Sequence, residues 1–187
     1  MLRTGRATTL AGLLALLLGS ATLSAAAPAQ AAPAALATIT CTGWTYTTYS
    51  PGLTHTVRPT TVTVDGNLNV PGPHSPTGSC LAVGSTASAG ERDVTALLEL
   101  SCDQLLTETG VETVRWNNGT ASSFPFTATV VRGLATTVIT ETGTVTSGEF
   151  LGGTVVETFT APNLDLLACD SPGGATVLNF ATVLTVL

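Results

Sequence analysis

Two histidines, His55 and His74, are the side chains best suited to acid–base chemistry near neutral pH. A zinc enzyme would need three protein ligands, with histidines close together or a histidine at a fixed spacing from a carboxylate. Neither histidine has such a neighbour, and both lie in connections rich in proline and glycine. We therefore expect solvated loop histidines, and a secreted hydrolase that pairs His55 or His74 with a carboxylate is the competing hypothesis.

The acidic residues include one pair whose spacing suggests chemistry. Glu141 and Glu157 fall in neighbouring predicted strands and could face each other, as the carboxylates of a glycosidase do. Carboxylates on the solvent side of a strand are far commoner in an acidic protein, so we expect that placement. The segment from Asp65 to Asn69 begins like a calcium loop, but Pro76 stands where the twelfth-position glutamate would be. A turn is the better interpretation of that segment.

The aromatic residues give one hint of binding. Trp44 and Tyr46 share a strand face, with Tyr49 nearby, and such a row can stack against sugar rings or apolar ligands. A buried core row explains the pattern more often, and we expect it here. The sequon Asn118-Gly119-Thr120 is already accounted for by a turn. The serine-nucleophile motif G-x-S-x-G is absent, so the sequence predicts no catalytic, cofactor-binding or metal-binding residue.

The N-terminus has the pattern of a secretory signal peptide. Arg3 and Arg6 precede an uncharged apolar run from Leu10 to Leu23, and a small-residue stretch follows. We place cleavage after Ala31, because the alternative site after Ala27 would leave proline at the first mature position. The apolar run is shorter than the ~20 residues of a membrane span. The sequence thus predicts a signal peptide over 1–31, a disordered tail over 32–37 and one β domain over 38–187.

Export places the four cysteines in an oxidising compartment, where an even number favours two disulfides. The four residues are Cys41, Cys80, Cys102 and Cys169. They are far apart in the sequence, unlike the close pairs of a zinc site, and they can form two disulfides in three different ways. The chain has no lysine, and 12 acidic residues face 6 arginines. A nucleic-acid ligand or an anionic membrane would need a basic face, so we expect neither as a partner.

Threonine and valine dominate the domain, and these β-branched residues favour strands over helix. The expected strands lie near 38–48, 56–64, 68–70, 93–102, 111–116, 120–131, 136–146, 154–160 and 175–187, with one helical turn over 161–169. The stretches 69–79 and 81–92 are expected to be mobile loops. The last strand is apolar on both faces and should be central or well covered.

Two hairpins can be placed in register by matching their apolar residues. Three-residue loops are favoured at Asp65-Gly66-Asn67, with Asn67 left-handed, and at Asn117-Asn118-Gly119, with Gly119 left-handed. Long neighbouring strands joined by glycine turns indicate an antiparallel meander. We expect an all-β fold in which the meander closes as a small β-barrel, since closure removes exposed edges. The alternative is a two-sheet, immunoglobulin-like sandwich.

Three segments of the chain carry a recognisable pattern of strand and turn residues: Thr113–Thr120, Gly143–Gly152 and Asn163–Cys169. Together they resemble a family of small secreted all-β proteins from actinobacteria that has no assigned activity, and the resemblance covers most of the mature chain. It implies a shared fold and pairing of Cys41 with Cys80 and of Cys102 with Cys169. It implies no active site.

These observations favour a secreted, non-catalytic β domain with an extracellular binding or structural role. The alternatives are the secreted hydrolase, a small protease inhibitor or a ligand carrier, of which the last two rest on analogy alone. The interior of the barrel separates these possibilities. A packed interior would favour a surface-binding or structural role, and a lined cavity would favour a carrier.

Overall fold

A computed structural model describes residues 37–187 apart from 77 and 106–108. The predicted signal peptide and nearly all of the predicted tail therefore lie outside the described residues. None of the helices among the described residues is long and apolar enough to span a membrane. The elements are β1 (Thr38–Leu53), β2 (Arg58–Leu68), β3 (Ser79–Val83), β4 (Gly90–Leu100), β5 (Thr109–Trp116), β6 (Ala121–Arg132), β7 (Thr136–Thr144), β8 (Ser147–Gly148), β9 (Thr154–Pro162), the 3₁₀ helix η1 (Asn163–Asp170) and β10 (Ala175–Val186).

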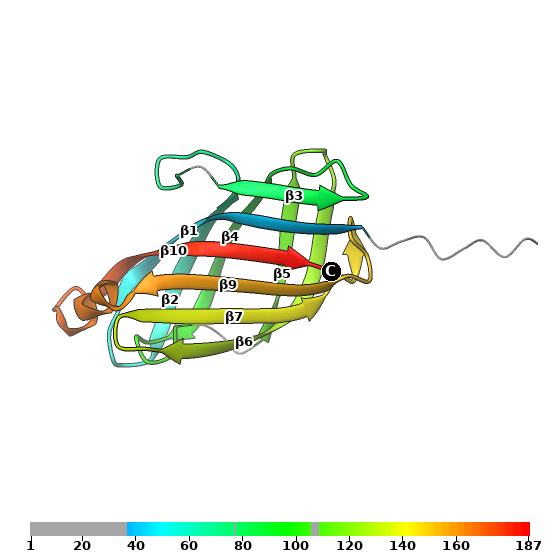
Figure 1. The fold of residues 1–187 in the computed structure, drawn as a ribbon. Helices are drawn as coiled ribbons and strands as arrows, with labels where there is room; N and C mark the ends of the chain where they lie inside the picture. The colour runs from blue at the N-terminus through cyan, green and yellow to red at the C-terminus, as the bar shows by residue number, and fades with distance from the viewer. Residues whose placement is uncertain (1–36, 77, 106–108) are drawn as a thin grey trace, which may run out of the picture. The chain divides into compact units, whose positions relative to one another are not determined.

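The strands form a closed antiparallel barrel of eight strands with two additions (Figure 1). The ladder runs β10-β9-β7-β6-β5-β4-β2-β1, and β1 pairs with β10 from Ile39 opposite Val186 to Thr48 opposite Val177. β3 pairs with the first part of β1, and β8 pairs with β6. The predicted barrel is thus confirmed, and the sandwich alternative is wrong. β10 is central as expected, although Val177 and Val183 on its outer face are about two-fifths exposed.

The β5–β6 hairpin has the predicted three-residue loop. The amide of Trp116 donates to the carbonyl of Thr120 across the loop, and Gly119 has a φ of +84°. The alternation then turns Val114, Trp116 and Phe124 into the barrel, where all three are buried. Asn118 Oδ1 accepts hydrogen bonds from the amide and the hydroxyl of Thr120, which confirms that the sequon residues serve the turn.

The hairpin expected at Asp65-Gly66-Asn67 does not exist. β2 continues through these residues, with Gly66 opposite Thr45 of β1 on one side and opposite Arg92 of β4 on the other. The left-handed asparagine of this region is Asn69, with a φ of 57°, rather than Asn67. The two expected mobile loops are also partly wrong, because β3 begins at Ser79 and β4 at Gly90.

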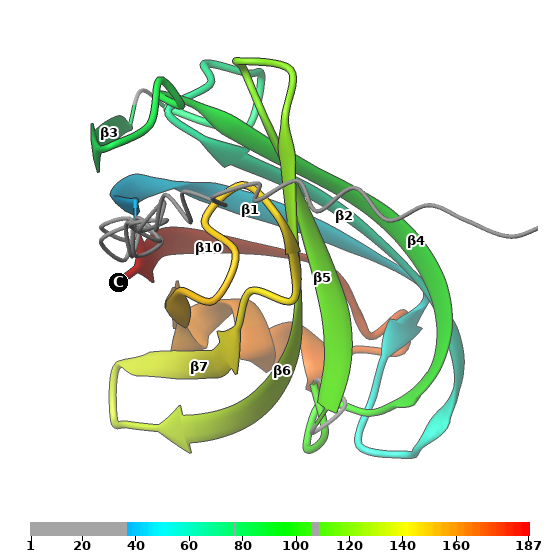
Figure 2. The same cartoon turned by 90° about the vertical axis from the view of Figure 1, so that its right-hand side faces the viewer.

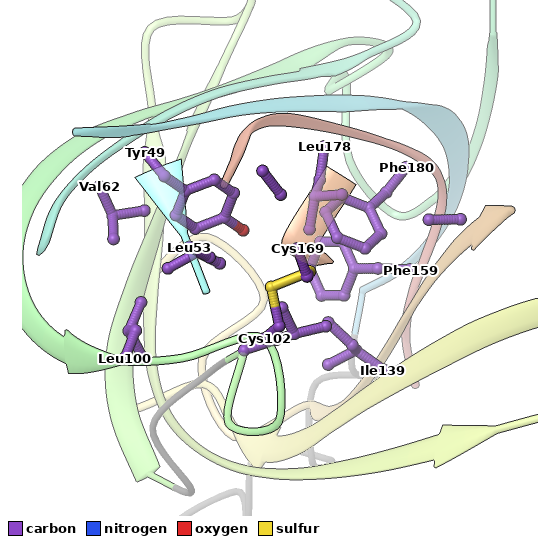
Figure 3. Packing of buried hydrophobic residues seen from close by; sticks show 13 residues of the cluster. Tyr49, Leu53, Val62, Leu100, Cys102, Ile139, Phe159, Cys169, Leu178 and Phe180 are labelled. Carbon is purple, nitrogen blue, oxygen red and sulfur yellow. A yellow bond between two sulfur atoms is a disulfide. The ribbon is translucent and has the colours of Figure 1, made fainter. Parts of the chain in front are cut away.

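Two apolar clusters occupy opposite ends of the barrel. The first surrounds the disulfide between Cys102 and Cys169 and includes Tyr49, Phe159 and Phe180 (Figure 3). The second surrounds Cys41, which is bonded to Cys80, and its members are Ile39, Leu68, Ala87, Val114, Trp116, Phe124, Val145, Phe150, Val155, Leu184 and Val186. Both disulfides are present, in the pairing that the resemblance implies. Each bond therefore fastens one end of the barrel.

β4 and β5 separate soon after they meet. Among the described residues their ladder has two pairs, Gly90 opposite Trp116 and Glu91 opposite Arg115. Beyond these pairs the strands diverge, as Figure 2 shows. Each strand keeps its other neighbour, since β4 pairs with β2 along its length and β5 pairs with β6. Among the described residues the closed ladder is therefore unpaired along most of the seam between β4 and β5, which we call the open seam.

Candidate functional site

A layer of polar side chains crosses the barrel interior between the two apolar clusters. Six strands contribute its members, and five of the six are less than 5% exposed: Thr45 of β1, Arg92 of β4, Glu112 of β5, Glu141 of β7, Glu157 of β9 and Thr182 of β10. Glu112 is the exception, with 14% of its side chain exposed at the seam. Each stands at an inward position of its strand, where the alternation would ordinarily place an apolar residue.

Arg92 is the centre of this layer. Its Nη1 donates to Glu112 Oε1 at 3.0 Å, and its Nη2 donates to Thr45 Oγ1 at 2.7 Å. Nη1 also lies 2.8 Å from Glu157 Oε1, but the N–H is not aimed at that oxygen, so this contact is ionic. The guanidinium carbon lies 5.1 Å from the centre of the Phe159 ring, a cation–π arrangement. Burial would lower the pKa of Arg92, but Glu112 and Glu157 outweigh that effect and raise it.

Gly66 makes room for this arginine. A Cβ at position 66 would stand 2.9 Å from Arg92 Nε, 3.0 Å from Nη2 and 3.1 Å from Cζ. The guanidinium thus packs flat against the backbone of β2, which a side chain at position 66 would prevent. This contact explains why a glycine that resembles a turn signal lies within a strand.

We predict that Gly66→Ala lowers the free energy of unfolding by about 1–3 kcal/mol, because the added methyl group displaces the guanidinium from its partners. Chemical denaturation of the purified protein measures this change. Gly173→Ala is the matched control, since a Cβ there would meet nothing within 4 Å. An equal effect of both substitutions would contradict the assigned role of Gly66.

The three glutamates lie together in the layer. Glu141 and Glu157 are directly opposite each other in the β7–β9 ladder, as the spacing allowed. The expectation that they face solvent is wrong, since they are 3% and 0% exposed. One carboxylate oxygen from each of Glu112, Glu141 and Glu157 lies within 4.8 Å of the others. The three side chains come from β5, β7 and β9, and Glu112 and Glu157 both contact Arg92.

Burial shifts the ionisation of these carboxyls. It raises the pKa of Glu141 to about 8, with the charge of Glu112 adding to the effect and Arg92 opposing it. Burial also raises the pKa of Glu157 well above its usual range, despite the neighbouring Arg92. One guanidinium can neutralise one carboxylate, so the layer holds protons on its remaining carboxyls at neutral pH.

This arrangement predicts a protein that is more stable in mild acid. The folded state keeps a proton on Glu141 up to about pH 8, whereas the unfolded chain releases it near 4.5. The contribution of Glu141 to the free energy of unfolding is therefore highest below about pH 4.5. It falls as the pH rises towards 8, by at most ~1.4 kcal/mol per pH unit. Denaturation curves between these limits measure the slope.

Glu141→Gln should flatten this pH dependence, because glutamine keeps the shape of the protonated carboxyl and does not titrate. Glu99→Gln, at an exposed position on β4, is the control and should leave the slope unchanged. A slope that Glu141→Gln does not alter would contradict the assignment.

A cavity of about 370 Å³ lies against the polar layer. Apolar and aromatic side chains supply most of its wall, among them Tyr49, Val62, Phe126, Phe159 and Phe180. Arg92, Glu112 and Glu141 supply its polar part. The volume lies within the ~300–1,000 Å³ range of small-molecule sites. The barrel therefore has a lined interior rather than a filled one in this region.

The open seam between β4 and β5 leads into this cavity. Asp93, Val94 and Ala96 line it from β4, and Val111 and Thr113 line it from β5. Val94 and Val111 are 53% and 74% exposed, so the entrance has an apolar rim. At the closed end of the seam, Arg115 Nη2 lies 2.7 Å from Asp93 Oδ2 and joins the two strands.

The chain matches no known protein family, and searches of curated proteins and of solved structures also find no match. The resemblance to secreted actinobacterial proteins therefore stays a prediction.

The structure places the two histidines outside the barrel. His55 Nδ1 lies 3.1 Å from Asp103 Oδ2, and its Nε2 lies 3.1 Å from Asp170 Oδ1. Hydrogen bonds to Asp103 and then to Asp170 raise the pKa of His55. Both ring nitrogens are thus engaged at an exposed site, which does not suit a general base. His74 is exposed and stacks on Tyr46, with ring centroids 3.9 Å apart.

The expected aromatic core row is only partly correct. Tyr49 points into the cavity and is buried, whereas Trp44 and Tyr46 are on the outer face of β1 and half-buried. The functional residues that sequence reasoning missed are Arg92 and Glu112. The pattern that could have revealed them is the two-residue alternation of side chains along a strand. Arg92 falls on the same strand face as Leu98 and Leu100, and Glu112 falls on the same face as Val114.

Proposed function

We propose that this protein is exported and binds a small, largely apolar ligand inside its barrel, as an extracellular carrier. The observation that carries the proposal is the cavity of about 370 Å³ that opens at the seam between β4 and β5. Barrels of eight strands have interiors of the size that holds one small ligand. A structural role alone would be served better by a filled interior, because an empty apolar cavity lowers stability.

Several features of the chain support an extracellular site of action. The two disulfides suit an oxidising environment, and each fastens an end of the barrel. The N-terminal sequence has the pattern of a cleavable export signal. The acidity of the chain, with a formal charge of −6, does not suit nucleic-acid or anionic membrane partners. A small molecule is the partner that the cavity accommodates.

The binding test uses a neutral aromatic probe, 2-naphthylmethanol, followed by its fluorescence and by calorimetry. We expect saturable binding of one molecule per chain. Ala96→Trp fills the cavity from β4 and should weaken binding at least about tenfold, whereas Leu97→Trp, on the exposed outer face of the same strand, should not.

Val64→Trp fills the cavity from β2 and provides a second blocking variant if Ala96→Trp does not fold. Circular dichroism checks the fold of each variant. Absence of binding by the unsubstituted protein, or equal binding by both blocking variants and the Leu97→Trp control, would contradict a cavity-bound ligand.

A further inference from the structure

Resting on the proposed carrier function, we infer that the cavity selects a ligand with a protonated primary amine on an apolar, aromatic body, and that Glu141 is the residue that binds the ammonium group. The balance of charge in the polar layer, the unpaired oxygen of Glu141 and the aromatic wall all favour a cation. They also disfavour an anion such as a fatty acid.

The charge balance of the layer is negative. Glu112, Glu141 and Glu157 surround a single guanidinium, that of Arg92. The cavity lining has a second arginine, Arg115, but it pairs with Asp93, which also lines the cavity. When the cavity holds no cation, protons must occupy the surplus carboxyls because burial penalises their charge. A ligand that brings a positive charge replaces such a proton. A ligand that brings a negative charge would meet carboxyls on the same wall.

Glu141 is the group available to a ligand. It lines the cavity, is 3% exposed, and its Oε2 has no hydrogen-bond partner. A buried polar atom without a partner is unfavourable, so a donor placed in the cavity would stabilise the protein at this point. Glu157 also has oxygens without a hydrogen-bond partner, but its Oε1 is in ionic contact with Arg92 and it does not line the cavity.

Arg92 is less available to an anionic ligand than Glu141 is to a cationic one. Its Nη1 contacts Glu112 and Glu157, and its Nη2 donates to Thr45. The third guanidinium nitrogen, Nε, has no hydrogen-bond partner but lies against the backbone of Gly66, since a Cβ built at that position would stand 2.9 Å from it. The geometry therefore directs the arginine towards the protein's own groups.

The wall of the cavity is suited to an aromatic cation. Tyr49, Phe126, Phe159 and Phe180 line it, and aromatic faces attract ammonium groups as well as apolar rings. Phe159 already contacts a cation, the Arg92 guanidinium. Glu112 is partly exposed at the seam and places a further carboxyl on the route into the site.

Binding of the amine has a defined proton balance. The ammonium ion enters with its charge, Glu141 loses its proton, and that proton passes to the buffer, leaving an ammonium–carboxylate pair. The charged groups that face Glu141 are Arg92 from β4, Glu112 from β5 and Glu157 from β9. The affinity for the amine should therefore rise with pH between about 5 and 8, because the free-energy cost of deprotonating Glu141 falls as the pH approaches its pKa.

The experiment compares three probes with the same ring system: 2-naphthylmethylamine, 2-naphthylmethanol and 2-naphthoate. We expect the amine to bind roughly ten- to a hundredfold tighter than the alcohol at pH 7.5, as for a hydrogen bond between charged groups, and the naphthoate to bind weakest. Calorimetry in buffers of different ionisation enthalpy should show release of a proton with the amine and none with the alcohol.

Glu141→Gln separates this inference from the carrier function. We expect the variant to lose the preference for the amine and the proton release while it still binds the alcohol, and Glu99→Gln to behave as the unsubstituted protein. If the alcohol binds and the amine is no tighter, the amine selectivity is wrong and the carrier function stands. If no probe binds, both are wrong. Titration with Ca²⁺ or Mn²⁺ alone that saturates the site, and that Glu141→Gln abolishes, would also overturn the amine assignment.

Discussion

Arg92→Met is expected to lower the free energy of unfolding by about 3–5 kcal/mol at neutral pH, because it leaves three carboxyls in the barrel without their cation. Methionine fills a similar volume, so a cavity contributes little to the loss. The effect should be larger at pH 8 than at pH 5, because the carboxyls of the variant must hold still more protons in the folded state. Urea denaturation at the two pH values measures both changes.

Arg115→Met is the matched control for this prediction. Arg115 pairs with Asp93 at 2.7 Å, a distance like those of Arg92, but the two side chains are 55% and 56% exposed. Exposed ion pairs contribute about 0–1 kcal/mol, since water screens them and solvates each partner when the other is removed. Equal losses for the two substitutions would show that burial of the polar layer is not what makes Arg92 important.

Removal of the disulfide between Cys102 and Cys169 by Cys102→Ala/Cys169→Ala should lower the free energy of unfolding by about 4 kcal/mol. The bond closes a stretch of 67 residues and so restricts the unfolded chain strongly. It also joins the segment after β4 to the end of η1, next to the open seam. Denaturation of the variant in the same buffer measures the loss.

His55 reports on this bond independently of stability. Its two partners, Asp103 and Asp170, each directly follow a bonded cysteine, so the disulfide holds them on either side of the ring. The pKa of His55, measured by NMR titration, should fall in the Cys102→Ala/Cys169→Ala variant. It should stay unchanged in Cys41→Ala/Cys80→Ala, which lacks the bond at the other end of the barrel. Equal pKa values in both variants would contradict this coupling.

Local patterns predicted most of the strands and one hairpin because each depends on residues close together in the chain. The β5–β6 loop followed from the match of Val114 and Trp116 with Phe124 and from a glycine able to adopt positive φ. The Asp65-Gly66 signal failed although its residues are equally typical of a turn. Gly66 is required by the guanidinium of Arg92, which belongs to another strand and is not visible in the local sequence.

The amino-acid sequence by itself determined an all-β domain with an export signal pattern and four cysteines, because β-branched residues in alternation and an even number of cysteines act through local or compositional rules. Tertiary structure alone decided that Glu141 and Glu157 are buried. An isolated strand does not reveal whether a charged residue faces solvent or the interior, because that depends on which neighbours close the barrel. Closure brought one arginine and three glutamates from four strands into one polar layer, and Arg92, Glu112 and Glu141 of this layer line the cavity.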